Sequence, residues 1–84
     1  MRLTDLSYAA LRRILLKLEF SERTGPAAQH IFEHEPSDTI FIFRPYKTNE
    51  HIHYGDLFSV RKLLDERGVL PAESFDQLLR KNTA

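Results

Sequence analysis

The stretch that decides the fold runs from Gln29 to Arg44 and reads QHIFEHEPSDTIFIFR. Two segments of it, Gln29–His34 and Thr39–Arg44, carry β-branched and aromatic residues of the kind that favour strands. Glu35-Pro36-Ser37-Asp38 lies between them, and proline suits the second position of a type I turn when Ser and Asp follow. The sequence therefore predicts a β-hairpin.

Outside the hairpin, the sequence predicts one more strand and three helices. The strand is Phe20–Thr24, which Gly25-Pro26 ends. Apolar residues recur at helical spacing in three segments, Tyr8–Leu18, Leu57–Arg67 and Ala72–Lys81. The order α-β-β-β-α-α predicts an α+β domain whose helices cover one face of a three-stranded antiparallel sheet.

Several residues are suited to the ends and exposed faces of these helices. Ser7 is a natural N-cap of the first helix, and Asp56 is the predicted N-cap of the second. Gly68 suits the C′ position at which the second helix stops. Arg61 and Asp65 are four positions apart, a spacing that predicts an ion pair along that helix.

Composition limits the possible classes of protein. The chain has 84 residues, 42% of them hydrophobic and 29% charged, which is typical of one small globular domain spanning residues 1–84. The absence of cysteine excludes disulfides, thiolate zinc sites and cysteine nucleophiles. No apolar run approaches the roughly 18 residues needed to cross a bilayer, and the first residues lack a signal-peptide core. We therefore expect a cytoplasmic protein with no membrane partner and no cofactor.

The charges balance. Twelve Lys and Arg residues face twelve Asp and Glu residues, so the formal net charge is zero. Domains that bind nucleic acid usually carry a basic excess, because their affinity comes largely from neutralising phosphates. Binding to RNA would therefore depend on a local basic patch.

Three short stretches resemble the HicA (YcfA-like) toxins of toxin–antitoxin systems. Leu15–Phe20, LLKLEF, is similar to the family's LxxLGF, with Glu19 where Gly is usual. Gln29–His34, QHIFEH, is similar to the strand HHIYRH, and Tyr54–Leu70 is similar to KGTLRSILKQAGL. The resemblance implies a fold like that of a double-stranded RNA-binding domain, endoribonuclease (mRNA interferase) activity and a HicB-like antitoxin as partner.

The resemblance also implies where the catalytic residue should lie. The family's single catalytic histidine stands three positions before the aromatic residue of the strand, and counting back from Phe32 gives Gln29. A glutamine has no titratable proton and cannot act as a general acid or base. His30 is a candidate substitute, but neighbouring strand residues point to opposite faces. It would reach the family's position only if a bulge after Gly25-Pro26 shifted the register.

Five basic residues are candidates for contact with nucleic acid. Arg12, Arg13 and Lys17 form a stripe on the first helix, and Arg44 and Lys47 follow the third strand. Such residues form either an ordinary solvated surface or a patch that binds RNA phosphates.

The polar segment after the third strand contains two histidines that raise the question of a metal. His51 and His53 would share one face of an extended chain. A metal site needs further ligands, and a His-x-His pair does not assign one.

The third strand also indicates association. Ile40 and Ile42 alternate with Phe41 and Phe43, so one pair faces the helices and the other faces solvent unless something covers it. A bare apolar sheet face or a free strand edge is typical of a homodimer or of a domain with a bound partner.

Three hypotheses follow. In the first, the chain is a HicA-like RNA-binding domain that binds mRNA or structured RNA with weak or no ribonuclease activity. In the second, it is a protein-interaction module that binds a HicB-like antitoxin or itself. In the third, it is an active mRNA interferase that uses His30. The sequence leaves open whether the protein is an enzyme.

Overall fold

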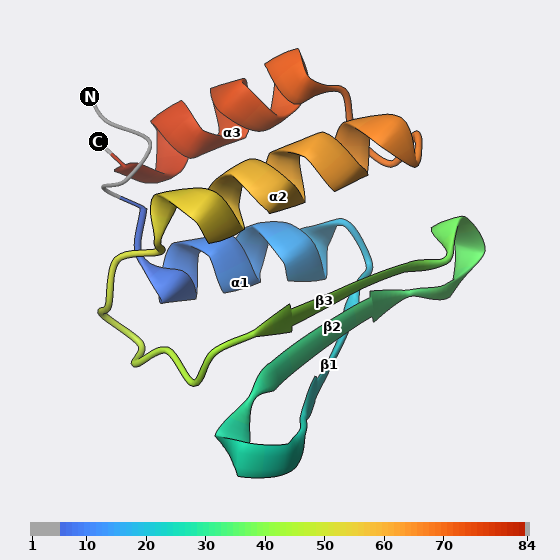
Figure 1. Ribbon diagram of the computed structural model, residues 1–84. Coiled ribbons are helices and arrows are strands. Elements are labelled where there is room, and N and C mark those ends of the chain that lie inside the picture. Colours follow the sequence, from blue (N-terminus) through green and yellow to red (C-terminus); the bar gives the residue numbers. More distant parts are fainter. Residues whose placement is uncertain (1–5, 84) are drawn as a thin grey trace.

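The computed structural model describes residues 6–83 of the 84-residue chain (Figure 1). It contains every helix and strand that the sequence predicts, with boundaries shifted by up to three residues. The elements, in order, are α1 (Tyr8–Lys17), β1 (Ser21–Thr24), β2 (His30–His34), β3 (Thr39–Phe43), α2 (Tyr54–Glu66) and α3 (Ala72–Thr83). Two single 3₁₀ turns, η2 (Pro26–Ala28) and η3 (Glu35–Ser37), connect the strands.

The three strands form one antiparallel sheet in the order β1-β2-β3. Phe32 on the central strand β2 pairs with Glu22 on β1 and with Phe41 on β3. Figure 1 shows the three helices on the same side of this sheet. The predicted α+β architecture, with helices over one face of a three-stranded sheet, is confirmed.

Burial along β3 separates the two faces of the sheet. Phe41 and Phe43 are buried beneath the helices, whereas Ile40 and Ile42 are 48% and 58% exposed on the outer face. The predicted alternation is therefore confirmed, with the phenylalanines inside. Among residues 6–83, no helix is both long enough and apolar enough to span a membrane.

The core joins the sheet to all three helices. Phe32 at its centre is fully buried, and so are Phe75 and Leu79 on α3. Arg61 binds Asp76 across the α2–α3 interface through two hydrogen bonds of 2.9 and 3.1 Å. The ion pair of Arg61 is thus with Asp76 and not with Asp65, whose charge still acts favourably on Arg61. In contrast, Lys62 and Glu66, also four positions apart, form an ion pair of 3.8 Å.

The predicted cap of α1 is confirmed and that of α2 is not. Ser7 Oγ accepts a hydrogen bond from the Ala10 N–H at 3.2 Å. In contrast, α2 begins three residues earlier than predicted, at Tyr54, and its N-cap is His53. Asp56 lies inside the first turn of α2, where its carboxylate binds partners from the preceding loop instead of free helix N–H groups.

That loop is tied to the chain that precedes α1. The Ile52 N–H donates to the Leu6 carbonyl at 2.9 Å, and Ser7 forms an isolated antiparallel bridge with His51. Ile52, which interrupts the polar segment in the sequence, is 1% exposed and belongs to the core. Its burial and these backbone contacts fix the loop beside the start of α1.

Candidate functional site

Gln29, which the resemblance in the sequence predicts to stand at the catalytic position, lies just before β2. The turn that leads to it contains Ala27 and Ala28 with φ values of 57° and 63°. The Gln29 carbonyl accepts a hydrogen bond from the Gly25 N–H at 2.8 Å, which closes the connection between β1 and β2. A Cβ atom on Gly25 would approach Ile31 Cδ1 to 2.5 Å, so a larger residue there would displace Ile31.

The pairing of β1 with β2 shows no shift in register. Four consecutive pairs, from Ser21 with Glu33 to Thr24 with His30, follow one regular antiparallel register. Gln29 precedes the strand, and its Oε1 and Ile31 Cδ1 both lie within 4 Å of the Cβ position of Gly25, so Gln29 is on the same side as Ile31, on the outer face. His30 lies on the helix side, with Phe32 and Phe43 as neighbours.

The contacts of His30 are those of a packed side chain. Its ring stacks on Tyr8 with a centroid distance of 4.4 Å. Its Nε2 lies 3.1 Å from the Tyr46 carbonyl oxygen, which can only accept, so Nε2–H is the donor. These contacts fix the ring position and place a proton on Nε2.

Tyr8 connects His30 to the acidic side chain of β1. The Tyr8 hydroxyl donates to Glu22 Oε2 at 3.2 Å, and Arg12 Nε donates to both Glu22 oxygens at 2.8 and 3.0 Å. The Tyr8 ring also stacks with Tyr46 at a centroid distance of 5.8 Å. Side chains from α1, β1, β2 and the following loop therefore meet here.

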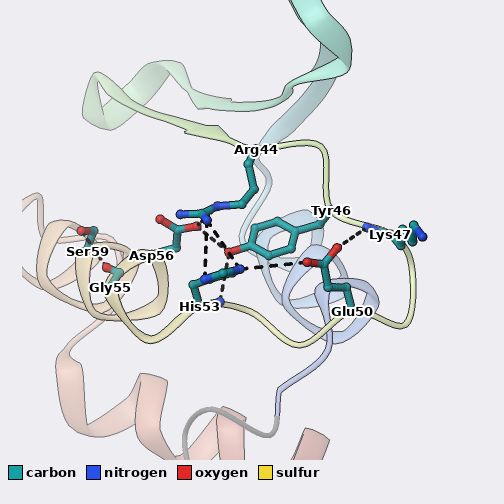
Figure 2. A network of polar contacts seen from close by, with 8 residues as sticks. All are labelled: Arg44, Tyr46, Lys47, Glu50, His53, Gly55, Asp56 and Ser59. Atoms are coloured by element: carbon teal, nitrogen blue, oxygen red, sulfur yellow. Dashed lines mark hydrogen bonds and ion pairs between the residues drawn. The ribbon is translucent and has the colours of Figure 1, made fainter.

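Tyr46 continues these contacts into a polar network at the start of α2 (Figure 2). Its hydroxyl donates to Asp56 Oδ2 at 2.5 Å and accepts from the His53 N–H at 3.0 Å. Arg44 Nε lies 3.3 Å from the same Asp56 oxygen. The phenol, the carboxylate and the guanidinium together hold the first turn of α2 against the end of β3.

Arg44 also covers the His53 ring. Arg44 Nη1 lies 3.5 Å from both ring nitrogens of His53. If Nη1 lay in the plane of the ring at these distances, it would overlap Cε1, the atom between the two nitrogens. Nη1 therefore lies above the face of the ring. Glu50 approaches the same ring, with Oε2 4.0 Å from His53 Nε2, and its other oxygen accepts from the Lys47 N–H at 3.1 Å. Figure 2 shows His53 between Arg44 and Glu50.

The two tyrosine hydroxyls remain protonated at neutral pH. Burial, and then the hydrogen bond to Asp56, raises the pKa of Tyr46 to about 12. Burial, and then the charge of Glu22, raises the pKa of Tyr8 above its usual value. Both groups therefore act as hydrogen-bond donors to carboxylates, which is a positioning role rather than a proton-transfer role.

The structure brings three of the predicted site residues into one region and leaves the others apart. Arg12, His30 and Arg44 are linked through Tyr8 and Tyr46. Gln29 faces the opposite side of the sheet, and the exposed residues Arg13, Lys17 and Lys47 form no ion pair with any residue from 6 to 83.

Sequence reasoning missed the acceptors that neutralise the basic residues. Glu22 pairs with Arg12, and Asp56 pairs with Arg44, so two of the five candidate cations already contact a carboxylate. A signal was available, because a tyrosine on a core-facing helix position needs a hydrogen-bond partner for its hydroxyl. Tyr8 is such a residue.

The histidines of the 44–56 segment do not assemble a metal site. Within the part of the chain that the structure describes, no three His, Asp or Glu side chains are placed to hold a metal ion together. His53 instead lies against the Arg44 guanidinium, whose positive charge disfavours a cation.

Comparisons of the chain with protein-family models, curated proteins and solved structures find no match. The resemblance to HicA toxins therefore stays a prediction from the sequence.

Proposed function

We propose that this chain is a HicA-like RNA-binding domain, with a fold like that of a double-stranded RNA-binding domain and with weak or no ribonuclease activity. The observation that carries the proposal is the placement of His30. Its ring is stacked on Tyr8 and donates to the Tyr46 carbonyl, on the face opposite Gln29. The helix–three strands–helix order and the helices over one sheet face support the fold assignment.

The proposed loss of catalysis follows from proton transfer. Metal-free cleavage of RNA needs a group that removes the proton of the 2′-hydroxyl or protonates the leaving oxygen, and loss of such a group costs about 10²–10⁴ in rate. Gln29 has no titratable proton. The ring of His30 is held on the helix side of the sheet by its stack on Tyr8 and by its Nε2–H bond to the Tyr46 carbonyl, so it cannot replace a group at the position of Gln29.

The proposed RNA contacts are the exposed cations. Arg13 and Lys17 on α1 and Lys47 in the loop are free to meet phosphates, because no carboxylate among residues 6–83 neutralises them. Arg12 and Arg44 are 46% and 51% exposed despite their ion pairs. With zero net charge, the chain is expected to bind RNA weakly and with a strong dependence on salt.

A cleavage assay tests the catalytic half of the proposal. We expect purified protein to cut structured RNA no faster than buffer, and His30→Gln to leave that background unchanged. Gln29→His is the informative gain-of-function variant, because it returns an imidazole to the family position. Robust cleavage by the parent that His30→Gln abolishes would replace the proposal with an active interferase that uses His30.

A binding titration tests the RNA half. We expect affinity for structured RNA to fall steeply between low and physiological salt. Lys17→Glu should weaken binding and reduce the slope of the salt dependence by about one. Lys81→Glu on α3 is the matched control, because it makes the same charge change at another exposed lysine with no ion pair among residues 6–83, and it should have less effect. Absence of binding even at low salt would overturn the RNA-binding proposal.

The outer face of the sheet favours a second candidate function, that of a protein-interaction module. Ile40 and Ile42 are about half exposed on neighbouring positions of one strand face. A protein partner would cover them, and a HicB-like antitoxin is the partner that the family resemblance suggests. Stable binding to such a protein with no RNA binding would favour this candidate.

A further inference from the structure

The two edges of the sheet differ in how they are protected. Strand β1 has four residues and includes Glu22 and Arg23, and such charges discourage the pairing of an edge strand with another chain. Strand β3, Thr39–Phe43, has five residues, none of which is charged or a proline. Within residues 6–83, its only backbone partner strand is β2. The edge of β3 is therefore open to a further strand.

The exposed apolar residues on the outer face of the sheet, the face away from the helices, lie at the β3 edge. On the β1 side, Arg23 and Glu33 cover the face with an ion pair of 2.6 Å, and Ile31 beside them is 5% exposed. On β3, Ile40 and Ile42 remain 48% and 58% exposed. A strand added beside β3 would give both isoleucines apolar neighbours and would leave the rest of the face unchanged.

The charges at the two ends of β3 select the occupant and its direction. Asp38 precedes the strand, and Arg44, which contacts Asp56 but is 51% exposed, follows it. When a second copy of β3 runs antiparallel with Phe41 opposite Phe41, the strand end next to Asp38 in each copy lies beside the strand end next to Arg44 in the other. A parallel arrangement would place like charges together, and like charges directly opposite one another are destabilising.

The same register is favoured by the side chains. It pairs Ile40 with Ile42 of the second copy, and Thr39 with Phe43, so all five residues of the strand are used. If the two strands were shifted by one residue, the isoleucines of one copy would lie opposite the threonine and phenylalanines of the other, which belong to the buried face. We propose that β3 pairs with β3 of a second copy about a two-fold axis at Phe41, which produces a six-stranded sheet. Because the edge is short, the dimer is expected to be weak and to form at high protein concentration.

Disulfide trapping tests the register, because the chain has no native cysteine. Ile40→Cys and Ile42→Cys chains are mixed at high concentration and oxidised. We expect the mixed 40–42 disulfide to form several-fold faster than the 40–40 or 42–42 product. Ser21→Cys, on the outer face of the opposite edge strand, is the matched control and should cross-link only at the random-collision rate.

Sedimentation of uncross-linked protein tests the dimer itself. We expect the sedimentation coefficient of the parent to rise between micromolar and millimolar protein, and Ile42→Lys to remove that rise. Ser21→Lys adds the same charge to the other edge and should leave the rise intact. Circular dichroism checks that each variant is folded.

Three outcomes would overturn the proposal. In the first, the parent protein stays monomeric at millimolar concentration. In the second, the 40–40 and 42–42 disulfides form faster than the mixed disulfide, which indicates parallel strands. In the third, the Ser21→Cys control cross-links as fast as the β3 variants. The trapping experiment does not depend on the lysine variants, so it decides the matter even when Ile42→Lys fails to fold.

Discussion

Tyr46 is the residue that connects the sheet to the first turn of α2. Its hydroxyl donates to Asp56 and accepts from the His53 N–H, while its carbonyl accepts from His30. The residue is 5% exposed, so its hydroxyl has little access to water as an alternative partner. Loss of that one oxygen would leave the His53 N–H without its present acceptor and Asp56 with Arg44 alone.

We expect Tyr46→Phe to lower the free energy of unfolding by about 1–2 kcal/mol at pH 7, because it removes a hydrogen bond to a charged acceptor. Denaturant unfolding followed by far-ultraviolet circular dichroism measures the loss. Tyr54→Phe is the matched control, since Tyr54 is 56% exposed and its hydroxyl has no hydrogen bond among residues 6–83; its stability should match that of the parent. Equal effects of the two variants would contradict the role given to the Tyr46 hydroxyl.

The raised pKa of Tyr46 also predicts how stability depends on alkaline pH. The unfolded chain loses the tyrosine proton near the ordinary pKa of 10.0, whereas the folded chain keeps it up to about 12. The stabilisation is therefore complete below pH 10 and is lost as the pH rises from 10 to about 12. Over that range, the stability of the parent should fall more than that of Tyr46→Phe, although Tyr8 contributes to the fall in both.

At the scale of the elements, α1 and α2 end in the same way. The residue after each C-cap has a left-handed backbone, with φ 70° at Glu19 and φ 71° at Gly68. The Phe20 N–H then donates to the Leu15 carbonyl at 3.0 Å, and the Val69 N–H donates to Leu64 at 2.9 Å. Glycine suits this position because it has no Cβ to clash.

The two helix ends predict substitutions of opposite effect. Glu19→Gly should raise the free energy of unfolding by about 0.5–1 kcal/mol, because it relieves a left-handed non-glycine residue. Gly68→Ala should lower it by about 1 kcal/mol, because it introduces that strain at a position where nothing else lies within 4 Å of the new Cβ. Thermal unfolding of both variants measures the changes. If both variants changed the free energy of unfolding in the same direction, backbone strain would not determine the stability of these two helix ends.

At the scale of the whole molecule, α3 is part of the only core of the described chain. Phe75 and Leu79 are fully buried in the cluster that contains Phe32 of the central strand. The Arg61–Asp76 pair adds a second link between α3 and α2. The sheet and α3 should therefore unfold together.

Phe75→Ala should lower the stability of the entire domain by about 3–5 kcal/mol, the usual range for removing a buried phenylalanine ring. Hydrogen exchange of the β2 amides reports the change at a distance, and their protection should fall in step with the global stability. Phe75→Leu, a milder change expected to cost about 1–1.5 kcal/mol, serves if the alanine variant does not fold. Unaltered protection of β2 would mean that α3 unfolds separately.

The elements were predictable because their signals are local. The alternation in Thr39–Phe43, the Ser7 cap and the glycine after α2 each act within a few residues. The start of α2 was not predictable in the same way. Asp56 has the side chain of an N-cap, but contacts with Tyr46 and Arg44 hold it within the first turn of the helix. At Asp56, contacts with residues distant in the sequence therefore outweigh the local preference of aspartate for the N-cap position.

By itself, the sequence determined the order of the elements and the apolar face of each. Only the tertiary structure decided which charges are neutralised and which apolar residues stay bare. Glu22 reaches Arg12 from ten residues away, and Asp56 reaches Arg44 from twelve, while Ile40 and Ile42 remain uncovered. The reason is physical: helix and strand periods depend on neighbours along the chain, but an ion pair or a covered face depends on what folding brings beside it.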